Sequence, residues 1–262
     1  MSAIGLTLPR RGGAAFRRLF FFLFLSLLFA PTPGLSDPLL DKLDAHYYYP
    51  QREGLKKLAF TIHWAQLDPF SGGDDKKLLN NPTVRFNWQA GMAAPRFEME
   101  ATEKDVPAER ELQILQFMNQ YAEIFIPVPL SQKLSGYSLN AQRRGKDFLE
   151  VRYTADQPQP VLQYDFKIDS GRRVIDTLYM KMKSGPQSVT SHFIYTQRGT
   201  KWQVVESRAR YEIGGHQYEE ILEFFYEQVE GFWLPSRIRQ QLKEGSRLAQ
   251  SNVFTLSRYQ VN

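Results

Sequence analysis

Alternation of apolar and polar residues with a period of two runs through most of this chain, and it limits the fold to one built mainly from β-strands. The first strand that we expect covers 57–64, where four apolar residues share one face: Leu58, Phe60, Ile62 and Trp64. Short turns that contain glycine, such as Gly214-Gly215 and Glu230-Gly231, separate the later strands. Such turns join antiparallel neighbours, because parallel strands need long crossovers. The second half of the chain is therefore predicted to be an antiparallel meander.

Two segments have helical rather than strand periodicity. Between 108 and 125 the apolar residues recur at spacings of three and four: Leu112, Leu115, Met118, Ala122 and Phe125. Asp105 and Pro107 precede this amphipathic helix, and Pro127 follows it. A shorter helix is predicted from Pro38 to about Tyr48.

A single domain over 37–262 is the simplest organisation, because no repeat, low-complexity tract or linker interrupts this range. We expect a mainly β fold with few helices. Roughly ten to twelve strands exceed the usual sheet size, and open sheets of that length normally curl. The predicted architecture is a long, curved antiparallel sheet, an unclosed half-barrel with helices packed on its concave side.

Residues 1–36 have the three-part layout of a secretory signal peptide. Four arginines precede an apolar run of 12 residues, from Leu19 to Ala30, in which only Ser26 is polar. A helix needs about 20 residues to cross a bilayer, so removal after Ser36 is favoured over the alternative, an uncleaved N-terminal anchor. We expect the processed chain to start at Asp37, without a permanent membrane anchor.

Charge and cysteine content exclude several classes of function. Four of the 33 basic residues lie in 1–36, so the rest of the chain has 29 Lys and Arg against 28 Asp and Glu. This balance removes the argument for nucleic-acid binding. The absence of cysteine excludes a disulfide-held fold, a lipid-modified cysteine, thiol catalysis and cysteine-ligated zinc. Together with the signal peptide, these features predict an unlipidated protein of a bacterial periplasm.

The layout resembles a known group, the lipoprotein-carrier superfamily of periplasmic proteins with the LolA/LolB-like fold. The matching features are the helix near Pro38, the strand that begins at Lys57, and the run from Tyr226 to Ile238. This run contains the phrase Y-x-x-V-x-G-x-x-L-P, which many relatives carry in similar form. The resemblance implies an open antiparallel barrel plugged by helices, and a carrier function. Carrier-specific lipid-gating residues of the group have no match in this sequence.

Bulky side chains at alternating positions of successive strands provide candidate ligand contacts. If they line a concavity, an acyl chain can bury there at about 0.8 kcal/mol per methylene. The alternative is that they form an ordinary core against the helix at 108–125. The candidate lining residues are Phe60, Ile62, Trp64, Phe86, Trp88, Phe97, Met99, Met180, Met182 and Phe193.

Motifs of enzyme chemistry are absent from the sequence. The histidines, His46, His63, His192 and His216, form no metalloprotease motif, and no nucleophile elbow, phosphate loop or dinucleotide turn occurs. His216 with Glu219 and Glu220 is interpreted as the solvated start of a strand rather than as a metal or acid–base cluster. Asp68, Asp74 and Asp75 lack the spacing of a calcium loop. We therefore expect no catalytic residue, metal or cofactor.

Three hypotheses about function follow. The first is a periplasmic carrier that holds a lipid, or the acyl part of a lipidated protein, in an apolar half-barrel. The second is a non-enzymatic interaction or envelope-sensor module on the same scaffold, with an envelope protein as its partner; it predicts a filled core and an exposed apolar patch. The third is an enzyme with an unfamiliar site, which requires converging polar groups in a pocket.

Overall fold

A computed structural model of the chain describes residues 37–67, 78–92, 94–100 and 106–262. The predicted signal peptide, the three aspartates of the calcium alternative and Asp105 lie outside the described residues. The predictions for these segments therefore stay predictions.

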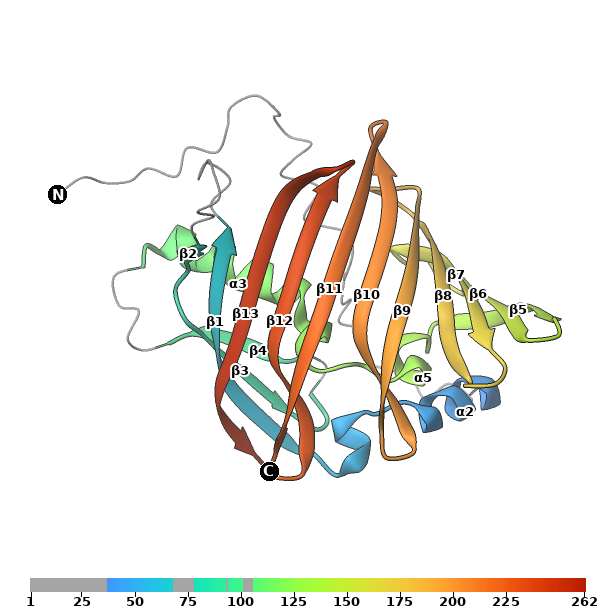
Figure 1. Ribbon diagram of the computed structural model, residues 1–262, viewed down its shortest axis with the longest axis horizontal. Coiled ribbons are helices and arrows are strands. Elements are labelled where there is room, and N and C mark those ends of the chain that lie inside the picture. The colour runs from blue at the N-terminus through green and yellow to red at the C-terminus, as the bar shows by residue number, and fades with distance from the viewer. Residues whose placement is uncertain (1–36, 68–77, 93, 101–105) are drawn as a thin grey trace.

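One antiparallel sheet organises the chain (Figure 1). Its strand order is β4-β3-β1-β13-β12-β11-β10-β9-β8-β7-β6-β5, with β2 paired to β1. The order ends at β4 on one side and β5 on the other, so the sheet is open, as predicted. The strand bounds are β1 Lys57–Leu67, β2 Leu78–Asn80, β3 Val84–Gln89, β4 Arg96–Met99, β5 Tyr137–Arg144, β6 Phe148–Ala155, β7 Val161–Asp169, β8 Val174–Met182, β9 Ser188–Arg198, β10 Lys201–Ile213, β11 His216–Val229, β12 Phe232–Glu244 and β13 Arg247–Val261.

The pairing of β1 with β13 joins the two ends of the chain. From β5 to β13 each strand pairs with the next along the sequence, as expected for a meander with short turns. The C-terminal strand β13 then pairs antiparallel with β1, in a register that places Ile62 opposite Leu256. The strands β1, β3 and β4 therefore extend the meander beyond its last strand rather than its first.

The helices are few and short, and α3 lies behind β13 and β12 in Figure 1. Within the described part of the chain, none is long and apolar enough to cross a membrane. Their bounds are α2 Pro38–His46, α3 Ala108–Gln120, α4 Ala122–Phe125 and α5 Leu130–Lys133, with a 3₁₀ helix, η1, at Pro50–Glu53.

One residue of the predicted buried face of the helix, Leu112, is exposed in the structure. Ile114 and Met118 are buried, but Leu112 is 57% exposed. Each residue turns an α-helix by 100°, so a step of three falls 60° short of a full turn. Two such steps separate Leu112 from Met118, which places them about 120° apart around the axis. The predicted single helix also divides at Tyr121, which ends α3 and precedes α4.

Two hydrophobic cores lie on the concave side of the sheet. The first core packs β1, β3, β4 and the C-terminal strands against α3 and α4, with Phe60, Met118 and Phe125 at its centre. The second core packs β6 to β10 against α2, through Leu40 and Leu43. The two cores lie on one continuous sheet, and each core packs one end of that sheet against its own helices.

Candidate functional site

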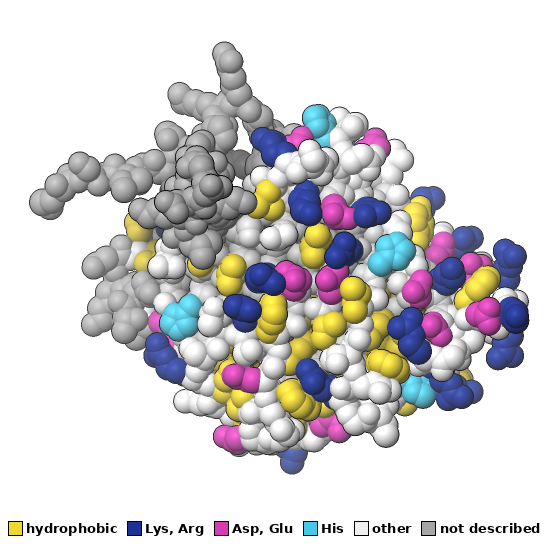
Figure 2. Space-filling view, in the orientation of Figure 1, with side chains coloured by type: hydrophobic (Ala, Val, Ile, Leu, Met, Phe, Trp, Pro, Cys, Tyr) yellow, Lys and Arg dark blue, Asp and Glu magenta, His cyan; other side chains and the backbone are white. Residues whose placement is uncertain are grey.

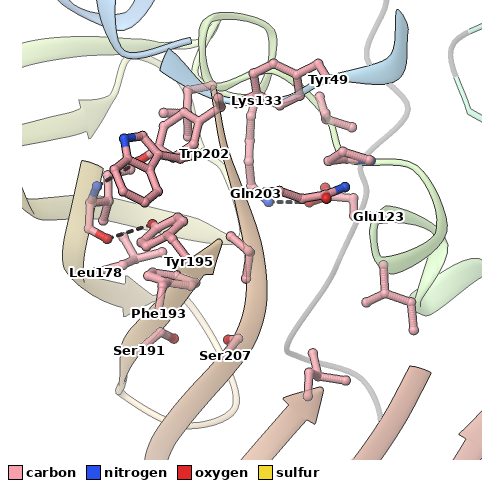
Figure 3. A pocket seen from close by; sticks show the side chains of 18 of the residues that line it. Tyr49, Glu123, Lys133, Leu178, Ser191, Phe193, Tyr195, Trp202, Gln203 and Ser207 are labelled. Atoms are coloured by element: carbon pink, nitrogen blue, oxygen red, sulfur yellow. Dashed lines mark hydrogen bonds and ion pairs between the residues drawn. The ribbon is translucent and has the colours of Figure 1, made fainter. Parts of the chain in front are cut away.

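A cavity of about 260 Å³ lies between the middle strands of the sheet and the segments that cover them (Figure 3). Its floor comes from β7 to β12, and its cover comes from 47–50 and 123–134. Most of the lining is apolar or aromatic: Tyr47, Tyr49, Ile124, Phe125, Leu134, Tyr164, Phe166, Ile175, Leu178, Met180, Phe193, Tyr195, Trp202, Val204, Leu222, Tyr226, Trp233 and Pro235. The cavity therefore lies between the sheet and the helical segments packed against it.

Small side chains on the floor create the hollow. One row runs across five neighbouring strands in register: Phe166, Leu178, Ser191, Ala209 and Glu220. In the next row, Ser207 stands between Phe193 and Leu222. Serine and alanine at the centre of both rows leave space that larger side chains fill elsewhere along the sheet.

A β-bulge in β10 shapes one side of this floor. The register between β9 and β10 shifts after Val204, which pairs with Tyr195, while Glu206 pairs with Ile194. Because a bulge adds one residue to one strand, alternation changes phase across it. Val204 and Ser207 consequently both line the cavity although they are three residues apart.

Three consecutive tyrosines anchor one side of the cover. The hydroxyl of Tyr47 accepts a hydrogen bond from the backbone N–H of Ile175 at 2.7 Å. The hydroxyl of Tyr48 accepts one from the N–H of Trp233 at 2.8 Å. Burial raises the pKa of Tyr47 to about 12. The run therefore joins α2 to two strands of the floor through neutral hydroxyl groups.

Asp44 fastens the other side of the cover. Its carboxylate is fully buried and accepts hydrogen bonds from the N–H groups of Leu130 and Ser131, at 2.8 and 3.0 Å, at the start of α5. Tyr49 donates to the same carboxylate at 2.8 Å, and Arg52 does so at 3.0 Å. One side chain of α2 thus holds η1 and α5 in place over the cavity.

The phrase that supports the family resemblance forms the hairpin at one end of the cavity. Tyr226 of β11 pairs with Pro235 of β12, and both line the cavity. The turn between these strands has positive φ at Glu230 and Gly231, a conformation that favours glycine. Arg198 lies over the ring of Trp233, 3.8 Å from its centroid. The sequence phrase therefore marks the site.

Glu220 is the buried acid of the cavity floor. Its residue is 3% exposed, and desolvation raises the pKa of its carboxyl group above the ordinary value of 4.5. Gln240 and Tyr121 donate hydrogen bonds to its Oε1 atom. The predicted solvated strand start holds for the exposed His216 and is wrong for Glu220.

A second ionic pair lies at the cover. Lys133 of α5 pairs with Glu123 of α4, and both line the cavity (Figure 3). The pair joins the two short helices across the loop between them. It also places both charges on the cover rather than on the floor.

Two of the ten predicted contact residues, Met180 and Phe193, line the cavity. Met182 belongs to the second core, outside the lining. The other seven pack in the first core, in contact with α3, α4 or each other: Phe60, Ile62, Trp64, Phe86, Trp88, Phe97 and Met99. Phe60 stacks on Phe86 with centroids 4.4 Å apart, and Trp64 stacks on Phe117 at the same distance. These seven side chains form a filled core because α3 and α4 pack directly on β1, β3 and β4 at that end of the sheet.

The histidines lie away from the cavity. His63, His192 and His216 are exposed, and His216 pairs with Glu244 at 2.8 Å. In the described ranges, no three His, Asp or Glu side chains come together as a metal site. Figure 2 shows charges of both signs scattered among hydrophobic side chains over the face formed by β9 to β13.

Comparisons with known proteins concern the fold alone. No protein-family model and no curated protein matches the chain. Among solved structures, a LolA superfamily protein from Nitrosomonas europaea is 7% identical, with a TM-score of 0.29 over 87% of this chain and 94% of that chain. A putative outer membrane lipoprotein-sorting protein domain from Vibrio parahaemolyticus is 9% identical, with a TM-score of 0.28 over 86% and 91%.

The MucA/MucB complex of Pseudomonas aeruginosa gives a TM-score of 0.21 at 9% identity, over 86% of this chain and 94% of that chain. Likenesses at these TM-scores carry no argument about function.

Proposed function

We propose that this protein is an exported, non-catalytic binding protein of the periplasm that holds the acyl chain of a lipid or of a lipidated protein. The observation that supports the proposal most directly is the apolar cavity on the concave side of the sheet. Aromatic rings and Met180 line it, and the flexible thioether of methionine suits a chain of variable shape.

The size of the cavity favours one chain. Ligand pockets typically measure roughly 300–1,000 Å³, and this one measures about 260 Å³. Each methylene that leaves water contributes about 0.8 kcal/mol. One acyl chain, part of it within the cavity, therefore suffices for measurable binding.

Processing at the predicted position would leave the start of α2 intact. Asp37 accepts a hydrogen bond from the N–H of Leu39 at 2.8 Å and caps α2. Tyr153 donates to its second carboxylate oxygen at 2.8 Å. Cleavage after Ser36 keeps this cap, and sequencing the N-terminus of the secreted protein tests the position.

Mass spectrometry of lipid extracted from the processed protein, purified from its native compartment, tests the proposal. We expect co-purifying acyl chains, and displacement of a fluorescent acyl probe by added lipid. Ser207→Leu fills the floor of the cavity and should reduce probe binding at least tenfold. Thr255→Leu, on the exposed face of β13, is the matched control and should bind as the original protein does. Lipid-free protein that also ignores the probe would contradict the proposal.

The interaction-module alternative has less support. It requires a contiguous apolar patch outside the core. The large exposed apolar residues among those described are Leu112, Leu139 and Ile194, which lie on three different elements. The experiment above distinguishes the two, because an interaction module need not bind acyl chains.

A further inference from the structure

A row of buried polar side chains crosses the first core and ends at the cavity. The indole N–H of Trp64 donates to Asn252 at 3.0 Å, and the amide of Asn252 donates to Gln240. Gln240 in turn donates to Tyr121 at 2.7 Å and to Glu220. The row runs over β1, β13, β12 and β11 in their order in the sheet. Of its members, Glu220 is the one that lines the cavity.

One oxygen of this row is left without a partner. Oε1 of Glu220 accepts from Gln240 and Tyr121, while Oε2 has no hydrogen-bond partner among the described residues, although it is buried. A buried polar group without a hydrogen bond costs about 1–3 kcal/mol. Glu220 also faces an apolar cavity from a fully buried position. A polar ligand group in the cavity would give this oxygen the partner that it lacks.

The surroundings of Glu220 favour a neutral partner. Ala209 and Leu222 flank it on the floor, and Ser191 lies beyond Ala209 in the same row, two strands away or about 10 Å. The cation at the cover, Lys133, is already paired with Glu123. A ligand group that hydrogen-bonds without carrying charge therefore fits this end of the cavity.

We propose that Glu220 is the polar anchor of the cavity, and that its Oε2 atom hydrogen-bonds to the carbonyl oxygen of an acyl ester or acyl amide whose chain fills the apolar part. This inference rests on the proposed function and names its ligand more closely. Gln240, the member of the row next to Glu220, donates a hydrogen bond to Oε1, so Oε2 is the oxygen that can bind the ligand.

The protonation state explains why the ligand group is an acceptor. Desolvation raises the pKa of Glu220 above its ordinary value, which shifts the equilibrium toward the neutral acid. In a neutral acid the proton occupies the oxygen that does not already accept hydrogen bonds, which is Oε2. The O–H group then donates to a carbonyl oxygen, and a cationic amine gains no ion pair.

Two neutral probes of matched chain length, methyl decanoate and dodecane, test the anchor by displacement of the fluorescent dye N-phenyl-1-naphthylamine. We expect the ester to bind about tenfold more tightly than the alkane, because one hydrogen bond to a buried partner contributes about 1.4 kcal/mol. Glu220→Leu should abolish this preference, measured as the ratio of ester affinity to alkane affinity within the same variant. Glu220→Gln should keep most of it, because the amide N–H donates in place of the acid. Glu227→Leu, on the exposed end of the same strand, is the matched control.

A second measurement does not depend on any variant. The infrared carbonyl stretch of methyl decanoate bound to the unaltered protein should lie below its position in an alkane solvent, as hydrogen bonding requires. An N-decanoyl peptide serves as the amide probe. Tighter binding of methyl decanoate would identify a lipid as the source of the chain, and tighter binding of the N-decanoyl peptide would identify a lipidated protein.

The outcomes separate the two proposals. Failure of the unaltered protein to bind either probe would contradict the proposed function. Equal binding of ester and alkane, with an unshifted carbonyl stretch, would overturn the anchor and leave the carrier function standing. A preference for ester that persists in Glu220→Leu would show that the carbonyl binds elsewhere.

Discussion

Glu220 couples the ionisation of one residue to the stability of the fold. Its carboxyl group titrates near pH 4.5 in the unfolded chain and at a higher pH in the folded protein. Between these two values the folded state binds more protons than the unfolded state, so the free energy of unfolding falls as pH rises. The neighbouring ionisable groups, Tyr121 and Tyr211, have raised pKa values and stay protonated in this range.

Replacing Glu220 by glutamine should remove this loss of stability. We expect Glu220→Gln and the original protein to differ least near pH 4. Between the unfolded and folded pKa values of Glu220, the free energy of unfolding of the variant should rise relative to that of the original protein, by up to about 1.4 kcal/mol per pH unit. Urea unfolding at a series of pH values measures the difference. Glu227→Gln should show none, and a flat difference for Glu220→Gln would contradict burial of this acid.

The burial of Glu220 was within reach of the sequence. Leu222 and Tyr226 share its side of a strand, so strict alternation places Glu220 on the apolar face. The prediction of a solvated start fails because the phase of the alternation, rather than the charge of Glu220 or the nearby glycines, decides its burial. What no local pattern shows is the partner: Gln240 and Tyr121 are distant in sequence and meet Glu220 only after the sheet forms.

Among the elements, α3 shows how a correct helix prediction still misplaced one side chain. The structure predicts that Met118→Ala costs about 2–5 kcal/mol, because a large buried side chain leaves a cavity. Leu112→Ala should change the free energy of unfolding by no more than about 0.5 kcal/mol. Chemical denaturation of both variants checks this. A large loss for Leu112→Ala would mean that Leu112 is buried, as the sequence predicts.

The cover depends on α2 through Asp44. Asp44→Ala removes the acceptor of two backbone N–H groups at the start of α5, and we expect a loss of about 3 kcal/mol. Hydrogen exchange in 128–134 should rise in parallel, which a loss of packing in α2 alone would not produce. Asp41→Asn, one turn earlier in α2, is the control. Unchanged exchange in Asp44→Ala would show that other contacts hold the cover.

The whole molecule is expected to unfold as one unit. The two hydrophobic cores share one sheet, and the strands β11 and β12 contribute to both. We therefore predict a single transition, with the same midpoint in near- and far-ultraviolet circular dichroism. Two midpoints would contradict the proposal of one domain over 37–262.

At this scale the sequence predicted the type of architecture but not the position of the cavity. Alternation and short turns are local, so they indicate an antiparallel meander wherever the chain is read. The place of β1 beside β13 is a pairing between the two ends of the chain, which no local pattern encodes. Phe60 and Phe86 have the same pattern as Phe193, and only the position of α3 and α4 separates filled core from cavity.

The pairing of β1 with β13 also sets the order in which the molecule can be completed. The partner of β1 on that side is the last strand, of 15 residues, so a growing chain cannot join its first strands to the meander until its final segment is available. Until then the backbone N–H and C=O groups of β1 that later pair with β13 can bind a strand of another molecule. A chain that emerges from its N-terminus therefore leaves β1 unpaired on this side until residues 247–261 have emerged.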